Sequence, residues 1–313
     1  MKKTLYYLKQ LKQKGEKITW AVTYDFWTSR AAQEAGCEML LCGDSLANTV
    51  LGYESTNCVN TDDVMLFNKA VRRGAPDVFL VGDLTSGSYE QSNEQAVETA
   101  FRFVKESSVD AVKFEGDKRI SNRIKAVTDA GIPVIFHAGL TPQRLASLGG
   151  YRVQGKTLDS FENLVEDVES TIWAGAFAVL VEGVPSEVGE QITKRFGEKI
   201  ITFGIGGGPH FNGQLLLNAD LTGSVGNLRP TFAKNYIPGA MHDLMVDLAK
   251  VAPEDLQKYG KETRMDGFYA LNYYAIKQYV REVKESIFPG PSYCYQLKPE
   301  ELALLKTSKY WLE

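Results

Sequence analysis

The chain has 313 residues, of which 44% are hydrophobic and 24% are charged, and its net charge is −4. These values are ordinary for a soluble globular protein and exclude a chain that is disordered, collagen-like or coiled-coil throughout. The length suits one large α/β barrel or two modest domains, and the slightly negative charge argues against nucleic acid as a partner.

Short runs rich in β-branched and aliphatic residues recur along the chain, and each is followed by a helical pattern. Most of these runs are apolar on both faces, which is typical of strands in a buried parallel sheet. In chain order the predicted strands span residues 18–24, 39–42, 78–81, 111–115, 133–137, 178–182 and 200–203.

The intervening segments 91–106, 120–130 and 160–174 have apolar residues at helical spacing. Seven strand-then-helix units predict an α/β fold of the (β/α)8 TIM-barrel type over residues 1–236, with the last strand near residues 215–220. A doubly wound open sheet is the alternative, but no G-x-G-x-x-G sequence follows the first strand.

Residues 237–313 differ from the rest, because two long helical patterns, 240–250 and 266–285, replace the alternation. Pro289 and Pro291 end the second pattern. We predict a C-terminal helical extension that packs on the barrel or forms an oligomer contact, and no second domain.

The four cysteines show no C-x-x-C spacing, so a zinc site or a dithiol motif is not expected. The N-terminus lacks the apolar stretch of a signal peptide, and no run of about 18 apolar residues predicts a membrane span. We therefore expect a cytoplasmic protein with free thiols.

Charged residues stand at the carboxyl ends of the predicted strands, the rim where barrels carry their active sites. Each acidic residue alone could cap a helix or lie in a turn, but four carboxylates on four strand ends favour a functional site. The candidates are Asp44, Ser45, Asp83, Lys113, Glu115, His137 and Glu182.

Oxygen ligands without a thiolate favour Mg²⁺, which keeps several waters and leaves room for a chelating substrate. A 2-oxo acid chelates through its carboxylate and keto oxygens, and the metal then stabilises an enolate. Lys113 and Glu115 are two residues apart on one strand, so both point into the site, where Lys113 could balance carboxylate charge. At this rim His137 is also predicted to be functional.

Nine segments, in this order along the chain, resemble the ketopantoate (3-methyl-2-oxobutanoate) hydroxymethyltransferase family, and the similarity is clearest over residues 1–236. The segments are GDSL at 43–46, GYEST at 52–56, AVRRGAP at 70–76, VKFEG at 112–116, GLTPQ at 139–143, GGYRVQG at 149–155, VEGVP at 181–185, GIGGG at 204–208 and FAKNY at 232–236.

The resemblance implies a (β/α)8 barrel of the phosphoenolpyruvate mutase/isocitrate lyase superfamily, assembled as a decamer. It implies Mg²⁺-dependent transfer of a one-carbon unit from 5,10-methylenetetrahydrofolate to the enolate of 3-methyl-2-oxobutanoate, a step of pantothenate synthesis. By resemblance the metal ligands are Asp44, Asp83 and Glu115, the last directly or through water, and Asp83 also borders the substrate. Ser45 and Lys113 would hold the substrate, Glu182 would remove the C3 proton, and His137 would lie close by.

The chain departs from the family where Thr85 and Ser86 replace apolar residues after Asp83, and its tail is longer than expected. From Thr85 and Ser86 we expect a more polar acceptor pocket and hence a different 2-oxo acid. Two alternatives remain open. One is a carbon–carbon lyase of the same superfamily that acts without folate, although its usual cysteine loop is missing. The other is a catalytically silent homologue that binds or assembles.

Overall fold

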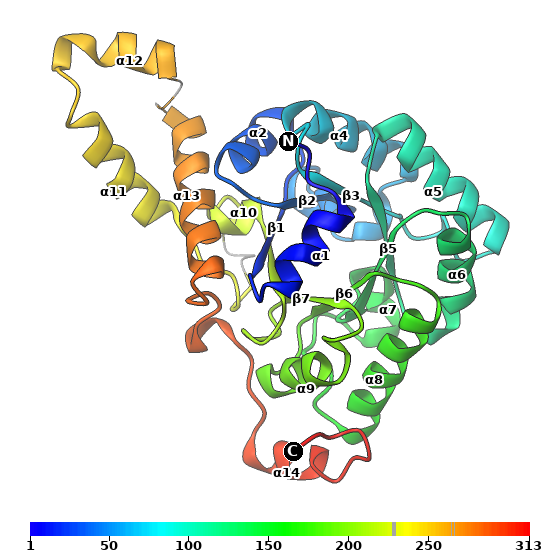
Figure 1. The fold of residues 1–313 in the computed structure, drawn as a ribbon. Coiled ribbons are helices and arrows are strands. Elements are labelled where there is room, and N and C mark those ends of the chain that lie inside the picture. The colour runs from blue at the N-terminus through cyan, green and yellow to red at the C-terminus, as the bar shows by residue number, and fades with distance from the viewer. Residues whose placement is uncertain (227–229, 264, 266) are drawn as a thin grey trace.

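The computed structural model describes residues 1–226, 230–263, 265 and 267–313. Its centre is a closed barrel in which β1 to β8 follow one another around the ring, and every neighbouring pair is parallel (Figure 1). The strands are β1 (Ile18–Val22), β2 (Met39–Cys42), β3 (Phe79–Asp83), β4 (Ala111–Glu115), β5 (Val134–Gly139), β6 (Ala178–Glu182), β7 (Ile201–Ile205) and β8 (Gly213–Leu217). The (β/α)8 prediction is confirmed, and the open sheet is excluded.

Helices surround the barrel and also form its C-terminal part. The α-helices are α1 (Leu5–Gln13), α2 (Phe26–Glu34), α3 (Leu46–Thr49), α4 (Thr61–Gly74), α5 (Asn93–Ser107), α6 (Ser121–Asp129), α7 (Leu145–Leu148), α8 (Leu158–Trp173), α9 (Ser186–Phe196), α10 (Asn218–Leu221), α11 (Ile237–Leu248), α12 (Leu256–Thr263), α13 (Gly267–Lys284) and α14 (Pro299–Leu305). Short 3₁₀ turns are η1 (Thr56–Cys58), η2 (Lys118–Ile120), η3 (Pro142–Arg144), η5 (Pro253–Asp255) and η6 (Pro291–Tyr293).

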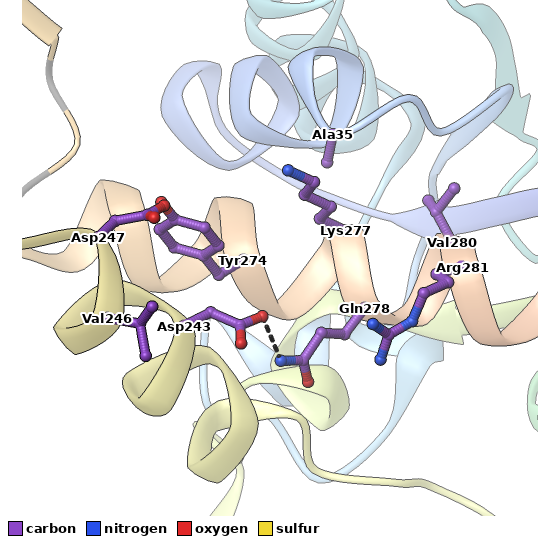
Figure 2. A pocket seen from close by; sticks show the side chains of 9 residues that line it. All are labelled: Ala35, Asp243, Val246, Asp247, Tyr274, Lys277, Gln278, Val280 and Arg281. Carbon is purple, nitrogen blue, oxygen red and sulfur yellow. Dashed lines mark hydrogen bonds between the residues drawn. The ribbon is translucent and has the colours of Figure 1, made fainter.

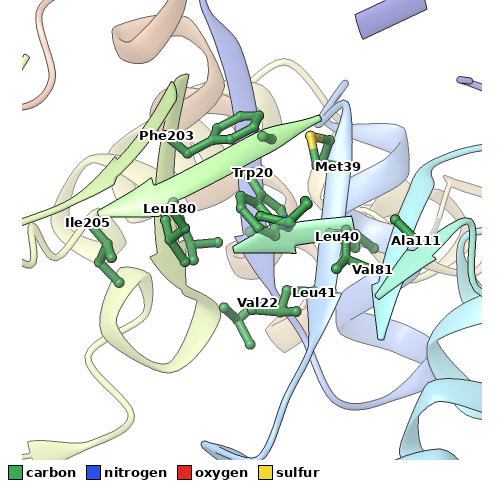
Figure 3. Packing of buried hydrophobic residues seen from close by; sticks show 14 of the residues in the cluster. Trp20, Val22, Met39, Leu40, Leu41, Val81, Ala111, Leu180, Phe203 and Ile205 are labelled. Atoms are coloured by element: carbon green, nitrogen blue, oxygen red, sulfur yellow. The ribbon is translucent and has the colours of Figure 1, made fainter. Parts of the chain in front are cut away.

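Large apolar side chains fill the barrel interior, so it is a packed core and not a channel. The rings of Trp20 on β1 and Phe203 on β7 meet edge to face with centroids 5.0 Å apart, beside Met39 and Leu180 (Figure 3). Because side chains alternate along a strand, the residues two positions further on point to the same interior at the carboxyl end. This alternation places Val22, Leu41 and Glu182 at the upper, open end of the core.

The long helix α13 packs against α2 and β1, between the first and last strands of the ring. The buried hydroxyl of Tyr279 lies 3.0 Å from the carbonyl oxygen of Trp20 on β1 and 2.6 Å from that of Gln214 on β8. Part of the predicted C-terminal extension thus covers the seam where the barrel closes. The helices α11 and α12 project away from the barrel (Figure 1).

The chain then runs to the opposite side of the barrel, where α14 and the last residues lie against α8 and α9 (Figure 1). Leu312 donates its backbone N–H to Gln191 and accepts a hydrogen bond from the same side chain. The rings of Trp311 and Phe161 lie 5.7 Å apart. No helix in the described parts of the chain is long and apolar enough to cross a membrane.

Candidate active site

A pocket of about 160 Å³ opens at the carboxyl ends of the barrel strands. All seven candidates from the sequence line it: Asp44, Ser45, Asp83, Lys113, Glu115, His137 and Glu182. The apolar part of its wall comes from β1, β2, β6, β7 and β8, through Val22, Leu41, Leu180, Ile205, Leu215 and Leu217. The structure therefore brings together residues separated by up to 138 positions, as the rim argument predicts.

The strand register places opposite charges side by side. In the parallel ladder Asp83 on β3 pairs with Lys113 on β4, and Glu115 on β4 pairs with His137 on β5. The ammonium of Lys113 lies 2.7 Å from Asp83 Oδ1 and 3.5 Å from Glu115 Oε2. Burial would lower the pKa of Lys113, but the two carboxylates raise it above its ordinary value, so the buried amine stays charged.

His137 connects two carboxylates. Its Nδ1 lies 3.0 Å from Glu115 Oε2, and its Nε2 lies 3.0 Å from Glu182 Oε2. Burial and the nearby Lys113 lower the pKa of His137. Glu115 and Glu182 raise it by a larger amount, so the pKa lies above its ordinary value, at about 9. This pKa favours the protonated imidazole, which lies between the carboxylates of Glu115 on β4 and Glu182 on β6.

Asp44 follows β2 and is buried against other acids. Its backbone N–H donates to Asp83 Oδ2 at 3.3 Å. Burial, followed by the charges of Asp83 and Glu115, raises the pKa of Asp44 well above its usual value. Burial also raises the pKa of Asp83, although Lys113 opposes this. The positive charge near these two carboxyl groups does not offset the effect of burial, so their neutral forms are favoured.

Ser45 closes one side of the pocket and is positioned by β1. Its Oγ lies 2.8 Å from the hydroxyl of Tyr24.

Glu182 is the most accessible of the acids, with 16% of its side chain exposed. It is thus able to meet a ligand in the pocket.

Several residues at this site were not singled out from the sequence: the lining residues Asn48, Thr49, Thr56, Pro142 and Tyr151, and also Gln143 and Tyr89, which lie behind the lining. Gln143 on η3 donates to Asp44 Oδ2 at 2.9 Å, and the hydroxyl of Tyr89 lies 2.7 Å from Gln143 Oε1. Gln143 belongs to the segment 139–143 quoted above, but it carries no charge, whereas most of the predicted site residues do. Its position just after a rim strand is the signal that could have found it.

Thr85 and Ser86, from which a more polar acceptor pocket was expected, do not line the pocket. Thr85 is buried and hydrogen-bonded to Thr61, with the hydroxyl oxygens 2.9 Å apart. Ser86 is exposed. The substitution changes packing behind the site and leaves the aliphatic wall intact.

A larger cavity of about 510 Å³ lies between α2, α11 and α13 (Figure 2). Its two acids are engaged by neighbouring side chains: Asp243 accepts from Gln278 at 2.8 Å, and Asp247 accepts from Tyr274 and from Lys250 outside the cavity. It lies outside the barrel rim and contains none of the predicted site residues.

A closed β/α barrel with buried acids, a lysine and a histidine at its carboxyl rim is the architecture of a TIM-barrel enzyme. A family model described as ketopantoate hydroxymethyltransferase matches residues 2–268. The 3-methyl-2-oxobutanoate hydroxymethyltransferase of Alkaliphilus metalliredigens is 40% identical over 296 residues, which is 95% of this chain and 94% of that relative. The protein of the same name from Emericella nidulans is 39% identical over 303 residues, 96% of this chain and 78% of the relative.

The chain belongs to the ketopantoate hydroxymethyltransferase family and is an enzyme of that class. Among solved structures, a 2,3-dimethylmalate lyase of the PEP mutase/isocitrate lyase superfamily has a TM-score of 0.56 at 18% identity, covering 85% of this chain and 97% of that chain. This likeness shows a shared fold. Since the Alkaliphilus match spans nearly all of both chains, the expectation of an unusually long tail is wrong.

Proposed function

We propose that this enzyme transfers a hydroxymethyl group from 5,10-methylenetetrahydrofolate to 3-methyl-2-oxobutanoate, with Mg²⁺ as its metal. The observation that carries the proposal is a small rim pocket with acids and a lysine on one side and aliphatic side chains on the other. The charged side suits the 2-oxo carboxylate group, and the apolar side suits a branched aliphatic tail.

The donor set fits a divalent cation. Asp44, Asp83, Glu115 and Glu182 contribute four formal negative charges, and Lys113 with a protonated His137 contributes two positive ones, which leaves −2. Within the described residues no group of three or more His, Cys, Asp or Glu is already arranged around a common metal position. Mg²⁺ is typically held by one or two carboxylates plus water and substrate oxygens, so its binding would need no more than Asp44 and Asp83 from the protein.

We assign the direct metal contacts to Asp44 and Asp83. Glu115 has both oxygens occupied, because Oε1 accepts the backbone N–H of Gln143 at 2.7 Å and Oε2 accepts from His137. Its contact with a metal would therefore pass through water. When bound, the cation would act as a Lewis acid toward the 2-oxo group and stabilise the charge that develops on its oxygen.

Lys113 and Ser45 would hold the substrate carboxylate, since a buried ammonium and a hydroxyl are suitable donors. Glu182 would remove the C3 proton, because its carboxylate is the least buried of the rim acids and lies beside His137 at the open pocket. His137 would keep Glu182 oriented and close to the substrate. The C3 carbon would then bond to the methylene carbon of the folate, and water would supply the hydroxyl oxygen. Both carbon–nitrogen bonds of that methylene carbon would break, and tetrahydrofolate would leave with the C3 proton and one proton of the water on its two nitrogens.

Folate as the one-carbon donor follows from the family resemblance. We also propose that the enzyme is cytoplasmic and forms a homo-oligomer, a decamer by resemblance, which light scattering on the purified protein can test. The division into a barrel of residues 1–236 and an extension of residues 237–313 stays a prediction.

The decisive experiment incubates the purified enzyme with 3-methyl-2-oxobutanoate and Mg²⁺, with and without 5,10-methylenetetrahydrofolate. Formation of ketopantoate only when folate and metal are both present is the expected result. Cleavage of a 2-oxo or 2-hydroxy diacid without folate would instead identify a lyase. Failure to turn over any of these substrates by a correctly folded protein would support the silent homologue.

A further inference from the structure

Gln143 is a buried, uncharged residue that contacts three strand ends of the active-site rim. It lies on η3, just after β5, and 6% of it is exposed. Its Nε2 is 2.9 Å from Asp44 Oδ2 and 2.9 Å from the carbonyl oxygen of Leu84, which follows β3. Its backbone N–H is 2.7 Å from Oε1 of Glu115 on β4.

The orientation of the Gln143 amide is set by its partners. The NH₂ group has two hydrogens, and both are directed at atoms that can only accept or that accept when ionised, Leu84 O and Asp44 Oδ2. The amide oxygen faces the hydroxyl of Tyr89 at 2.7 Å. A reversed amide would place its oxygen against two other oxygens, so the observed orientation is strongly preferred.

The backbone of Gln143 is held as firmly as its side chain. Its carbonyl oxygen accepts a hydrogen bond from Asn57 Nδ2 at 3.1 Å, and Tyr89 is itself buried against Phe114, with ring centroids 4.9 Å apart. The amide is therefore a rigid donor, and it is aimed at one oxygen of Asp44.

We propose that Gln143 is a positioning residue for the metal. By holding Asp44 Oδ2, it fixes the rotation of a carboxylate whose terminal torsion is otherwise broad, and it leaves Oδ1 of Asp44 to face the cation. This inference rests on the proposed function, because it takes Asp44 as a direct ligand. Groups that orient metal ligands in this way typically change metal affinity about 10- to 100-fold, and we expect the same factor in this site.

The test is Gln143→Met, which keeps the length of the side chain and removes its three hydrogen bonds. Mg²⁺ alone, and separately Mn²⁺ alone, are titrated into the metal-free enzyme by calorimetry. We expect Kd to rise about 10- to 100-fold. In assays the Mg²⁺ concentration for half-maximal activity should rise by a similar factor, while kcat at saturating Mg²⁺ changes much less.

The matched control is Gln191→Met. Gln191 is another buried glutamine, with hydrogen bonds of 2.9 and 2.7 Å to the backbone of Leu312, and it touches no rim carboxylate. The variant Gln191→Met should lower the Tm of the metal-free protein about as much as Gln143→Met does, and its metal affinity should be unchanged. This comparison separates positioning of Asp44 from a general loss of stability.

An unchanged Kd in Gln143→Met overturns the inference. This holds also when kcat falls and excess Mg²⁺ does not restore it. If the wild-type enzyme binds neither metal ion, the inference and the metal assignment of the proposed function fail together, whereas a metal-binding enzyme that does not transfer hydroxymethyl groups contradicts the function alone. Should Gln143→Met not fold, Gln143→Glu decides the question, because it keeps the size of the side chain and replaces the NH₂ group that donates to Asp44 and Leu84 by an acceptor. A rise in Kd supports the proposal, and no rise opposes it.

Discussion

The imidazole of His137 lies 3.0 Å through Nε2 from Oε2 of Glu182, and its other nitrogen is held by Glu115. A ring fixed at both nitrogens cannot rotate freely, so it keeps the carboxylate of Glu182 at the pocket. Glu182 comes from β6 and Glu115 from β4, with His137 on the strand between them. Three adjacent strands thus define the geometry around the proposed base.

Glu182→Gln should abolish most proton abstraction while keeping the shape of the side chain. We expect kcat to fall about 10²- to 10⁴-fold, the usual contribution of a general base. The direct measurement is exchange of the C3 proton of 3-methyl-2-oxobutanoate for deuterium, followed by NMR in D₂O with Mg²⁺ and no folate. Glu187→Gln is the control, since Glu187 on α9 accepts from the backbone of Leu297 outside the pocket. Exchange by Glu182→Gln at a rate within twofold of the wild type would exclude Glu182 as the base.

Lys113→Met should destabilise the metal-free enzyme. Removing the ammonium leaves Asp83 buried without its nearest cation and leaves Glu115 with His137 alone, and breaking such a buried pair costs about 3–5 kcal/mol. Added Mg²⁺ should recover part of this loss, because it supplies positive charge at the same place. Urea unfolding with and without Mg²⁺ measures both effects. Lys156→Met removes a partly exposed ion pair with Glu301 and should cost less than about 1 kcal/mol; equal losses in the two variants would contradict the prediction.

The aliphatic pocket wall predicts the acceptor preference. The value of kcat/KM should be at least about tenfold higher for 3-methyl-2-oxobutanoate than for a hydroxylated 2-oxo acid of the same length. Thr85→Val should leave this ratio unchanged because Thr85 lies outside the pocket. Leu180→Ala, which shortens a wall residue, should improve the relative turnover of acceptors that are one methylene longer. A wild-type preference for the polar acid would show that the wall does not select the substrate.

Asp167 on α8 predicts a pH dependence of stability that is independent of the active site. Burial raises its pKa from 3.8 to about 6, although the N–H of Lys118 opposes this. The folded chain therefore holds this proton more tightly than the unfolded chain, and the associated stability is full below pH 4 and is lost as pH rises through 6. Asp167→Asn, whose amide oxygen can still accept from Lys118, should match the wild type at pH 4 and exceed its stability at pH 8 by up to about 3 kcal/mol.

Urea unfolding at pH 4, 6 and 8 checks this prediction, with Glu169→Gln on the exposed side of the same helix as the control. A stability difference between Asp167→Asn and the wild type that does not change with pH would show that the carboxyl group is not perturbed by folding.

The strands of this chain could be predicted from the sequence because each is a short apolar run buried on both sides. Residues 39–42, 111–115 and 178–182 were predicted with the bounds that the structure has. The rim acids were also readable, since a parallel barrel places the last residue of every strand on one face. The place of Thr85 was predicted wrongly, because sequence shows that a residue follows a strand but not which neighbours its side chain will contact.

The sequence by itself determined the barrel, the family and the set of charged residues that gather at one rim, since these depend on alternation along strands and on local order. Only the tertiary structure decided which charges pair and which neutral groups orient them. The placement of Lys113 beside Asp83 and of Gln143 beside Asp44 depends on strand register and on a turn 99 positions away from Asp44 in the chain. Contacts of that kind arise from closure of the barrel, which no local pattern encodes.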